Sequence, residues 1–458
     1  MKVFLAVFIC RVLYFIGKRL GKGSSLPGKV ALKVFPDVLG RLRLPETVIA
    51  VTGSNGKTTT TELIVHVLEA CGRSVGWNLE GSNQTEGIAT LLLRIASFGG
   101  KIKRDAIVME CDERYARKIF EKVRPSVLLV TNLCRDQLTR NGHPEFVEDC
   151  IRAAITAAGE GTLLVLNADD PYVTALSAEA KETQENRPRA LWFGVKTQAL
   201  SDKAEEPSPC FAGIYDDGAF CPVCKARMVY DYRITGHYGC YNCKTCGLKR
   251  SEPDVEAVMQ EGQENRPLVF GDGLSMRALK PGITNTYNFC AAVAGAAAVG
   301  ISEGDCVSAL DNYELKSGRV LELTVGKRSG LLLLSKHENS FAYDTSLSWI
   351  VSQNKPCTVI VLVNTISRKY YTSETSWLWD IDFDILSDDN VKKIVLAGRY
   401  INELAARFVM SAVNPDKIGY VTDLSDLRKY VEGSTVGDVY AVTCFADKVK
   451  LLRALESN

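Results

Sequence analysis

Residues 50–61 carry the side chains best suited to chemistry in this chain: two glycines, a lysine and a run of threonines. An apolar run typical of a buried strand precedes them, and a helical pattern follows. The glycines let backbone N–H groups turn onto an anion, the lysine reaches the terminal phosphates of a nucleotide, and a threonine hydroxyl can bind Mg²⁺. The residues expected to contact ATP in this loop are Gly53, Asn55, Gly56, Lys57, Thr58 and Thr59.

The spacing is a relaxed form of the nucleotide-binding phosphate loop, because Val51 stands where the pattern has its first glycine. An ordinary strand-to-helix turn is the alternative. The two glycines, the lysine, the hydroxyl run and the flanking elements together favour nucleotide binding.

Four apolar runs without alternation, separated by helical patterns, predict strands at residues 48–52, 106–110, 126–131 and 162–167. This pattern predicts an α/β fold with a parallel sheet covered on both faces, in which ligands bind at the carboxyl ends of the strands. Glu110 ends the second strand and fits a magnesium site beside the phosphate loop, with Thr58 as the other ligand. Asp112 is an equivalent choice, and a solvated acidic turn is the alternative.

A second chemically active group consists of two C-x-x-C motifs separated by eighteen residues, formed by Cys221, Cys224, Cys243 and Cys246. This spacing is typical of a zinc ribbon, in which four thiolates close a tetrahedral structural site. Cys240 is a nearby thiol that could compete as a ligand, and four reduced core cysteines are the alternative. We expect the tyrosines between the motifs to form a small core, rather than a surface that stacks on nucleic-acid bases.

The chain has 458 residues, enough for two or three domains. Its 55 basic and 54 acidic residues give a net charge of +1, which argues against a dedicated nucleic-acid-binding protein. Fifteen cysteines without a secretory cleavage pattern are interpreted as reduced thiols plus one metal site in a cytoplasmic protein.

Residues 1–45 are expected to form a helical arm. The apolar run from Val3 to Ile16 is interrupted by Arg11 and is shorter than the roughly 20 residues that a membrane-spanning helix needs. We expect an amphipathic helix that packs on the first domain. Peripheral contact with the inner face of the membrane is the alternative, and it would suit a lipid-linked substrate.

Residues 46–315 are predicted to form a central ATP-binding domain, with the ribbon inserted at about residues 215–252. Residues 316–458 predict a second α/β domain that lacks a glycine-rich fingerprint, so we expect it to serve a substrate or partner. Asn288 precedes an alanine-rich helix that is expected to start at residue 289. It is interpreted either as the N-cap of this helix or as a nucleotide contact. Arg319 follows a short linker, from which an arginine could reach a γ-phosphate or an acyl phosphate.

The loop from Thr52 to Thr60 resembles that of the Mur ligases, the ATP-dependent enzymes that build peptidoglycan precursors. Further features narrow the resemblance to the MurT family of ligase-like subunits: residues 26–33 (LPGKVALK), residues 131–138 (TNLCRDQL), residues 376–380 (SWLWD) and the inserted ribbon. The likeness covers nearly the whole chain. It implies a Mur-ligase-like central domain followed by a Rossmann-like α/β domain.

The resemblance also implies a reaction. ATP would phosphorylate the α-carboxylate of D-glutamate in the lipid II stem peptide, and ammonia from a GatD-type glutaminase partner would convert the acyl phosphate to D-isoglutamine. Lys57, Mg²⁺ and Arg319 would spread the charge on the transferred phosphoryl group. The implied cofactors are ATP, Mg²⁺ and Zn²⁺, with lipid II as substrate and no nucleic acid.

The last domain departs from the family pattern. Family members carry Asn-Asp-Asn at a strand end, where the aspartate is thought to complete the partner's glutaminase site, whereas this chain has Asn364-Thr365-Ile366. Glu374 is the candidate substitute, and Asp380 is the other acid nearby in the chain. Residues 336–340 (KHENS) also differ from the usual Lys-Asn-Pro-Ala-Gly. The resemblance therefore implies ATP binding and leaves the coupling to a partner and the exact acceptor open.

Two rival functions follow from other protein classes. A Mur-type ligase that adds an amino acid without a glutaminase would be active alone and would not depend on glutamine. A non-catalytic ATP- and zinc-binding interaction protein would bind ATP but form no ADP with any stem-peptide acceptor.

Overall fold

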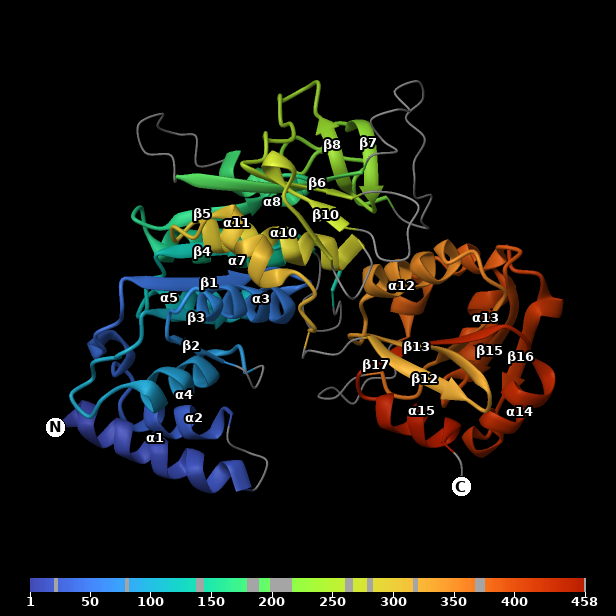
Figure 1. Cartoon of the computed structure of the whole chain (residues 1–458), viewed down its shortest axis with the longest axis horizontal. Helices are drawn as coiled ribbons and strands as arrows, with labels where there is room; N and C mark the ends of the chain where they lie inside the picture. Colours follow the sequence, from blue (N-terminus) through green and yellow to red (C-terminus); the bar gives the residue numbers. More distant parts are fainter. Residues whose placement is uncertain are drawn as a thin grey trace. The chain divides into compact units, whose positions relative to one another are not determined.

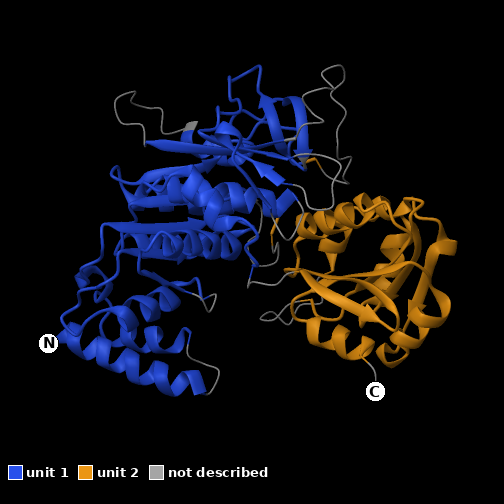
Figure 2. Cartoon of the chain, in the orientation of Figure 1, with its two compact units in different colours: residues 1–134, 144–210, 217–317 blue, residues 135–143, 211–216, 318–458 orange. Residues whose placement is uncertain are grey.

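The computed structural model of the chain divides into two compact units, which are coloured separately in Figure 2. Unit 1 holds residues 1–134, 144–210 and 217–317, and unit 2 holds residues 135–143, 211–216 and 318–458. The residues that the structure describes are 1–19, 24–78, 82–136, 144–178, 189–197, 216–259, 267–277, 283–315, 320–366 and 375–456. Arg319 and Glu374, two of the predicted site residues, lie outside these ranges.

Unit 1 is built on a nine-stranded sheet in the order β11-β10-β9-β6-β5-β4-β1-β3-β2 (Figure 1). Its strands are β1 (Thr47–Thr52), β2 (Val75–Trp77), β3 (Ala106–Glu110), β4 (Val127–Val130), β5 (Leu163–Asn167), β6 (Ala190–Thr197), β9 (Val255–Met259), β10 (Pro267–Val269) and β11 (Ser275–Arg277). All neighbours pair in parallel except β10 and β11, which form an antiparallel edge. The predicted parallel sheet is confirmed, and the four predicted strands match β1, β3, β4 and β5 to within one residue at each end.

Helices cover both faces of this sheet, as buried strands without alternation require. One layer holds α4, α5 and α7 with the arm helices α1 and α2, and the other holds α3, α10 and α11. The helices of unit 1 are α1 (Lys2–Arg19), α2 (Leu26–Val34), α3 (Lys57–Ala70), α4 (Thr85–Ile95), α5 (Glu113–Phe120), α7 (Pro144–Ala158), α8 (Pro171–Ala178), α10 (Ile283–Ala297) and α11 (Glu303–Leu310), with 3₁₀ turns η1 (Leu39–Arg41) and η3 (Gly271–Gly273).

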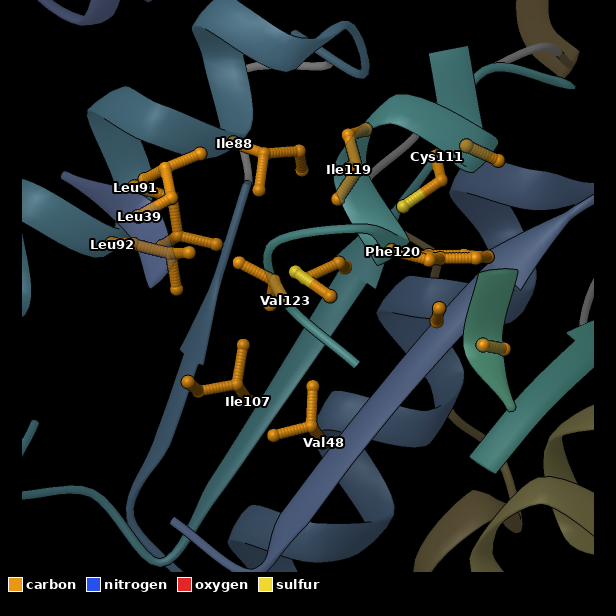
Figure 3. Close-up of a cluster of buried hydrophobic side chains, with 14 of the residues drawn as sticks. Leu39, Val48, Ile88, Leu91, Leu92, Ile107, Cys111, Ile119, Phe120 and Val123 are labelled. Atoms are coloured by element: carbon orange, nitrogen blue, oxygen red, sulfur yellow. The ribbon is translucent and has the colours of Figure 1, made fainter. Parts of the chain in front are cut away.

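The N-terminal arm is part of the core of unit 1. Ala6, Val7 and Cys10 of α1 are fully buried in the same cluster as Val48 of β1 and Ile107 of β3. Figure 3 shows the part of this cluster in which η1, α4 and α5 meet the strands. The expected packing of an amphipathic arm helix on the first domain is confirmed.

The ribbon lies between β6 and β9 in the chain and contains the antiparallel pair β7 (Val229–Thr235) and β8 (Tyr238–Asn242). Tyr230 and Tyr241 are buried in a small cluster with Met228 and Leu248. Tyr238 is 2% exposed. The expectation that the tyrosines form the core of the ribbon is confirmed for Tyr230 and Tyr241. Tyr238 packs instead against Tyr287 of α10, and Tyr232 is half-buried.

Unit 2 has a six-stranded sheet in the order β12-β13-β17-β14-β15-β16, in which only β12 is antiparallel to its neighbour. The predicted second α/β domain is therefore confirmed as a fold. Its strands are β12 (Val320–Val325), β13 (Arg328–Ser335), β14 (Cys357–Leu362), β15 (Val391–Ala397), β16 (Ile418–Val421) and β17 (Asp438–Cys444). Its helices are α12 (Ser340–Ser352), α13 (Ile401–Val409), α14 (Leu427–Ser434) and α15 (Lys448–Leu455), with 3₁₀ turns η4 (Ser376–Asp380), η5 (Phe383–Ser387), η6 (Pro415–Lys417) and η7 (Leu424–Asp426).

One local expectation is wrong. Asn288 does not cap a helix that starts at residue 289, because α10 already begins at Ile283. Asn288 lies one turn further on, where it is 4% exposed. Packing of α10 against α3 decides the start of the helix here, and it outweighs the general preference of asparagine for N-caps.

Candidate nucleotide and metal sites

The phosphate-loop residues of unit 1 form the turn between β1 and α3. Gly53 and Gly56 have φ values of +124° and +81°, a region that other residues rarely adopt. A Cβ atom added to Gly53 would collide with Thr131 Oγ1, and one added to Gly56 would collide with Asn288 Oδ1. Both glycines are therefore required by backbone conformation and by space, and α3 starts at Lys57 with its N-terminus at the loop.

The segment after β4 holds the loop in place. Asn132 Oδ1 accepts a hydrogen bond from the Asn55 backbone N–H (2.9 Å), and Asn132 Nδ2 donates to the Asn55 carbonyl (3.1 Å). The Thr131 hydroxyl donates to the same carbonyl (2.7 Å), and the Ser54 N–H donates to the Asn132 carbonyl (2.9 Å). Residues 131–134, here called the clamp segment, thus fix the loop by accepting from the N–H groups of residues 54 and 55. The N–H groups at the N-terminus of α3, which follows directly, would then face a phosphate.

Lys57 is 6% exposed and forms a buried ion pair with Glu113, the first residue of α5. Its ammonium also donates to the Gly53 carbonyl and, at 3.4 Å, to the Ser54 carbonyl. Glu113 therefore holds the lysine against the loop that it would serve.

Glu110 lies at the carboxyl end of β3, where the strand register pairs it with Val51 of β1. Asn83 donates to Glu110 Oε1 (2.9 Å), and the Asn78 side chain pairs with both backbone groups of Glu110. Thr58 is half-buried in the first turn of α3. Oxygen ligands at one edge of a parallel sheet suit Mg²⁺ with nucleotide phosphates, so Thr58 and Glu110 are kept as the proposed magnesium ligands. The alternative candidate Asp112 caps α5 through the Arg114 N–H (3.2 Å).

Asn288 reaches the loop from α10. Its Oδ1 atom accepts a hydrogen bond from the Thr60 hydroxyl (3.4 Å) and faces Gly56. Thr59 lies beside them in the first turn of α3 and is 7% exposed. The fold thus places Asn288 beside the phosphate loop, although more than 200 residues separate the two in the sequence. A contact between Asn288 and ATP stays a proposal.

We expect Gly56→Ala to raise the dissociation constant for Mg·ATP by about tenfold or more, since strain of about 1–3 kcal/mol at a positive φ is joined by the clash with Asn288. Calorimetric titration measures this constant. Gly72→Ala is the matched control, because Gly72 has φ +79° but no atom within 4 Å of the added Cβ. Equal affinities in the two variants would contradict the proposed role of the loop.

The four predicted zinc ligands come together in the ribbon. The sulfur atoms of Cys221, Cys224, Cys243 and Cys246 all lie within 4.8 Å of one another. Two of the sulfur pairs, 221–246 and 224–243, are 3.5 and 3.4 Å apart, near the roughly 3.8 Å of sulfurs in tetrahedral zinc sites. Burial alone would raise the pKa of Cys243, but backbone N–H groups of residues 246 and 245 lower it to about 6, which suits a thiolate ligand. Cys240 Sγ donates instead to Asp231 (3.4 Å).

The ribbon is attached to the phosphate loop through residues 168–170. Tyr241 OH donates to the Ala168 carbonyl (3.0 Å), and the Gly239 N–H donates to the Asp169 carbonyl (3.0 Å). Asp170 Oδ2 accepts from the Leu133 N–H of the clamp segment (2.7 Å), while its Oδ1 lies 3.4 Å from His237 Nε2. Burial alone would lower the pKa of His237, but the Asp170 carboxylate raises it. The fully buried Asp170 carboxylate therefore joins the ribbon to the clamp segment.

Asp169 forms the second polar link in this region. It pairs with Arg250 (2.6 Å) and also accepts from the Val195 N–H (2.7 Å) and Tyr287 OH (2.8 Å). Burial raises the pKa of Asp169, while Arg250 favours its charged form.

We expect Arg250→Met to lower the free energy of unfolding by about 3–5 kcal/mol, because it leaves the fully buried Asp169 carboxylate without its cation. Urea unfolding measures the change. Lys225→Met is the control: the Lys225–Glu145 pair is also short (2.7 Å), but its side chains are 62% and 56% exposed, so its loss costs about 1 kcal/mol or less. Similar losses in both variants would show that burial of the pair is not what matters.

In unit 2, the carboxyl ends of β13, β14 and β17 gather polar residues around Thr365. Asp447, which is fully buried, accepts hydrogen bonds from Asn364 N–H, Thr365 N–H (both 2.8 Å) and Thr365 Oγ1 (2.6 Å). His337 Nδ1 lies 3.1 Å from the Thr365 carbonyl. Asp380, by contrast, pairs with Arg135 (3.7 Å), which groups with this unit. The acid that folding brings to Thr365 is thus Asp447, which lies far from it in the sequence.

The roles of several site residues are not predictable from the sequence. Glu113, Asn83 and Asp170 act through contacts with residues 27 to 56 positions away, which no local spacing reveals. A signal existed for Asp170, because it stands before Pro171 at the start of α8, a usual place for a capping carboxylate. Its side chain indeed caps α8 through the Tyr172 N–H (2.9 Å).

Comparison with known proteins agrees with this architecture. The sequence model described as Mur ligase middle domain matches residues 51–243, and the one described as MurT ligase C-terminal matches residues 336–446. The chain is 29% identical, over all of its own length and 98% of the relative's, to the lipid II isoglutaminyl synthase (glutamine-hydrolyzing) subunit MurT of Streptococcus pneumoniae. It is 28% identical to the Staphylococcus aureus (strain N315) protein of the same name, covering 90% of this chain and 89% of that one.

Solved structures share the fold at lower identity. A pseudomurein peptide ligase type C from Methanothermus fervidus superposes with a TM-score of 0.65 at 20% identity, covering 92% of this chain and 80% of that one. MurF ligase from Thermotoga maritima, solved in complex with ADP, gives 0.61 at 16% identity, with 94% and 83% covered. These likenesses show that the chain has a Mur-ligase-like α/β fold.

Proposed function

The chain belongs to the Mur ligase family with a MurT-type C-terminal domain, and from this premise we propose that it is the ligase subunit that amidates lipid II during peptidoglycan synthesis. In this proposal ATP activates the α-carboxylate of D-glutamate in the stem peptide, and ammonia converts it to D-isoglutamine. The observation that carries the proposal is similarity to MurT subunits along the whole chain, joined to a glycine loop with a buried lysine in unit 1.

The reaction needs activation because a carboxylate is a poor electrophile at neutral pH. A carboxylate oxygen would attack the γ-phosphorus of ATP, and the bond to ADP would break. The ammonia nitrogen would then attack the carbonyl carbon, lose a proton and expel phosphate, which carries away one former carboxylate oxygen. An acyl phosphate is the intermediate that satisfies this balance.

The loop residues have defined tasks in this scheme. The clamp segment fixes the N–H groups of residues 54 and 55, and the N-terminus of α3 adds positive potential at the triphosphate. Lys57 would turn from Glu113 to the β/γ-phosphates when nucleotide binds. Mg²⁺, held by Thr58 and Glu110, would supply charge neutralisation at the transferred phosphoryl group. Arg319 is proposed, from the sequence alone, to stabilise charge on the same transferred phosphoryl group.

The ammonia source is the second part of the proposal. A GatD-type glutaminase would deliver ammonia, and the carboxyl end of the β13–β17–β14 edge in unit 2 is its proposed contact. Thr365 replaces the family aspartate there, and Asp447 is fully buried with both of its oxygens bonded to residues 364 and 365. Glu374 therefore remains the proposed substitute acid. We also propose that the protein acts in the cytoplasm, at the inner face of the membrane.

Co-purification with a glutaminase subunit, followed by ADP release with lipid II, tests both parts. Activity with glutamine and with ammonia is the expected result. Activity with ammonia but none with glutamine would uphold amidation and overturn coupling through unit 2. ADP release that needs an added amino acid instead of ammonia would indicate a Mur-type ligase. No ADP release with any acceptor would refute the proposal.

A further inference from the structure

Helix α1 has an exposed apolar face that the fold does not use. Six large side chains recur at three- and four-residue spacing and are each 40–62% exposed: Phe4, Leu5, Phe8, Val12, Phe15 and Ile16. At about 100° per residue they cover an arc of about 120°. We call these six residues the α1 stripe.

The opposite face of the same helix is anchored. Ala6, Val7, Cys10 and Gly17 are buried, and α1 packs on α2 and α4. Arg11 also donates to the carbonyls of residues 94 and 96, at 3.2 and 2.6 Å. The orientation of α1 is therefore fixed by the core, and the stripe points outward as a result.

Neighbouring residues extend the apolar surface and add positive charge. Phe98 is 43% exposed, and its ring centroid lies 4.8 Å from that of Phe4. The Arg19 guanidinium lies 4.5 Å from the centre of the Phe15 ring. Lys18 and Arg19 form the last turn of α1, and Lys2 stands in its first turn.

The charge of this region differs from that of the rest of the chain. Residues 1–36 contain seven lysines and arginines and no aspartate or glutamate, whereas the whole chain is nearly balanced with 55 basic and 54 acidic residues. A pocket of about 310 Å³ beside α1 is lined by Lys18, Arg94 and Arg104, and none of the described residues that line it carries a carboxylate. The positive charge therefore favours an anionic surface beside the stripe. An anionic phospholipid interface offers negative headgroups together with an apolar interior for the aromatic rings.

We propose that the α1 stripe docks unit 1 onto an anionic phospholipid surface, with α1 lying in the plane of the interface. Large apolar side chains on one face with lysine and arginine around them are the features of interfacial helices, whose affinity combines buried apolar area with attraction to anionic lipids. Within the described residues, no helix is long and apolar enough to cross a membrane. Docking through the α1 stripe would not depend on ATP turnover.

Co-sedimentation with phosphatidylglycerol–phosphatidylcholine vesicles, without nucleotide, tests it. The full chain binds these vesicles, binds pure phosphatidylcholine vesicles less, and is released in part by added salt. Phe8→Glu/Phe15→Glu weakens binding by about tenfold or more, because carboxylates replace aromatic rings and repel the surface. Lys18→Glu/Arg19→Glu weakens binding and flattens its salt dependence.

Val409→Glu/Met410→Glu is the matched control, since these side chains in unit 2 are 77% and 70% exposed but lie outside the stripe. It binds vesicles like the unchanged chain, and zinc content and circular dichroism verify that each variant is folded. Equal vesicle binding by the Phe8/Phe15 variant and the control would overturn the proposal. A dimer in light scattering that only the Phe8/Phe15 variant loses, with no vesicle binding, would overturn it as well, because a second copy would then occupy the stripe.

Discussion

Lys57→Met nearly abolishes ATP turnover in a chain that still folds, although with lower stability: ADP release with lipid II and ammonia falls by about 10²–10³-fold. An ammonium at the β/γ-phosphates stabilises charge that develops in the transition state, and losing one such donor in a closed site costs about 10²–10³ in rate. Lys57 is in addition the only lysine or arginine of residues 50–61. Steady-state release of ADP, with circular dichroism as a check on the fold, measures the effect.

A second variant separates the catalytic loss from the structural one. Lys57→Met leaves Glu113 buried at 5% side-chain exposure without its cation, which destabilises the protein. Lys57→Met/Glu113→Gln removes that unpaired charge, so thermal stability recovers while turnover stays absent. Recovery of turnover in the double variant would mean that the lysine served the fold and not the phosphates.

Loss of the zinc ion that the four cysteines would hold is expected to act on the nucleotide site as well as on stability. Chelation would remove the ion, and Cys221→Ser/Cys224→Ser would remove two of its four ligands. In both cases we expect Tm to fall by about 10 °C. The ribbon contacts residues 168–170, and Asp170 holds the Leu133 N–H of the clamp segment. The dissociation constant for Mg·ATP should therefore rise by about tenfold.

Cys240→Ser is the control, because this thiol lies in the ribbon but outside the four-sulfur cluster. Elemental analysis should find one zinc per chain in the control and none in the double variant. A zinc-free protein with unchanged Tm and unchanged ATP affinity would disprove the structural role of the cluster.

Local patterns accounted for the framework of this protein. Apolar runs located β1, β3, β4 and β5, because a strand buried on both faces reads as a continuous hydrophobic segment. The C-x-x-C spacing located the four cysteines whose sulfur atoms come together. Each motif is only four residues long, so it can be recognised in the sequence without knowledge of distant contacts.

Features that depend on tertiary contacts were not accessible in the same way. Glu113 becomes the partner of Lys57 only when β1 and β3 pair and place α5 beside the loop. The start of α10 was misplaced because Asn288 packs on Thr60 and Gly56 inside unit 1, where tertiary contact outweighs capping preference. Asp447 was missed for the same reason, since it meets Thr365 across two neighbouring strands.

The most direct measurement of the central claim follows oxygen from the acceptor to phosphate. Lipid II labelled with oxygen-18 in the D-glutamate α-carboxylate is incubated with the chain, Mg·ATP and ammonia, and the released inorganic phosphate is analysed by mass spectrometry. Activation through an acyl phosphate predicts one labelled oxygen in each phosphate, in step with ADP and amide. Phosphate without label, or ADP formed without the amide, would contradict the account.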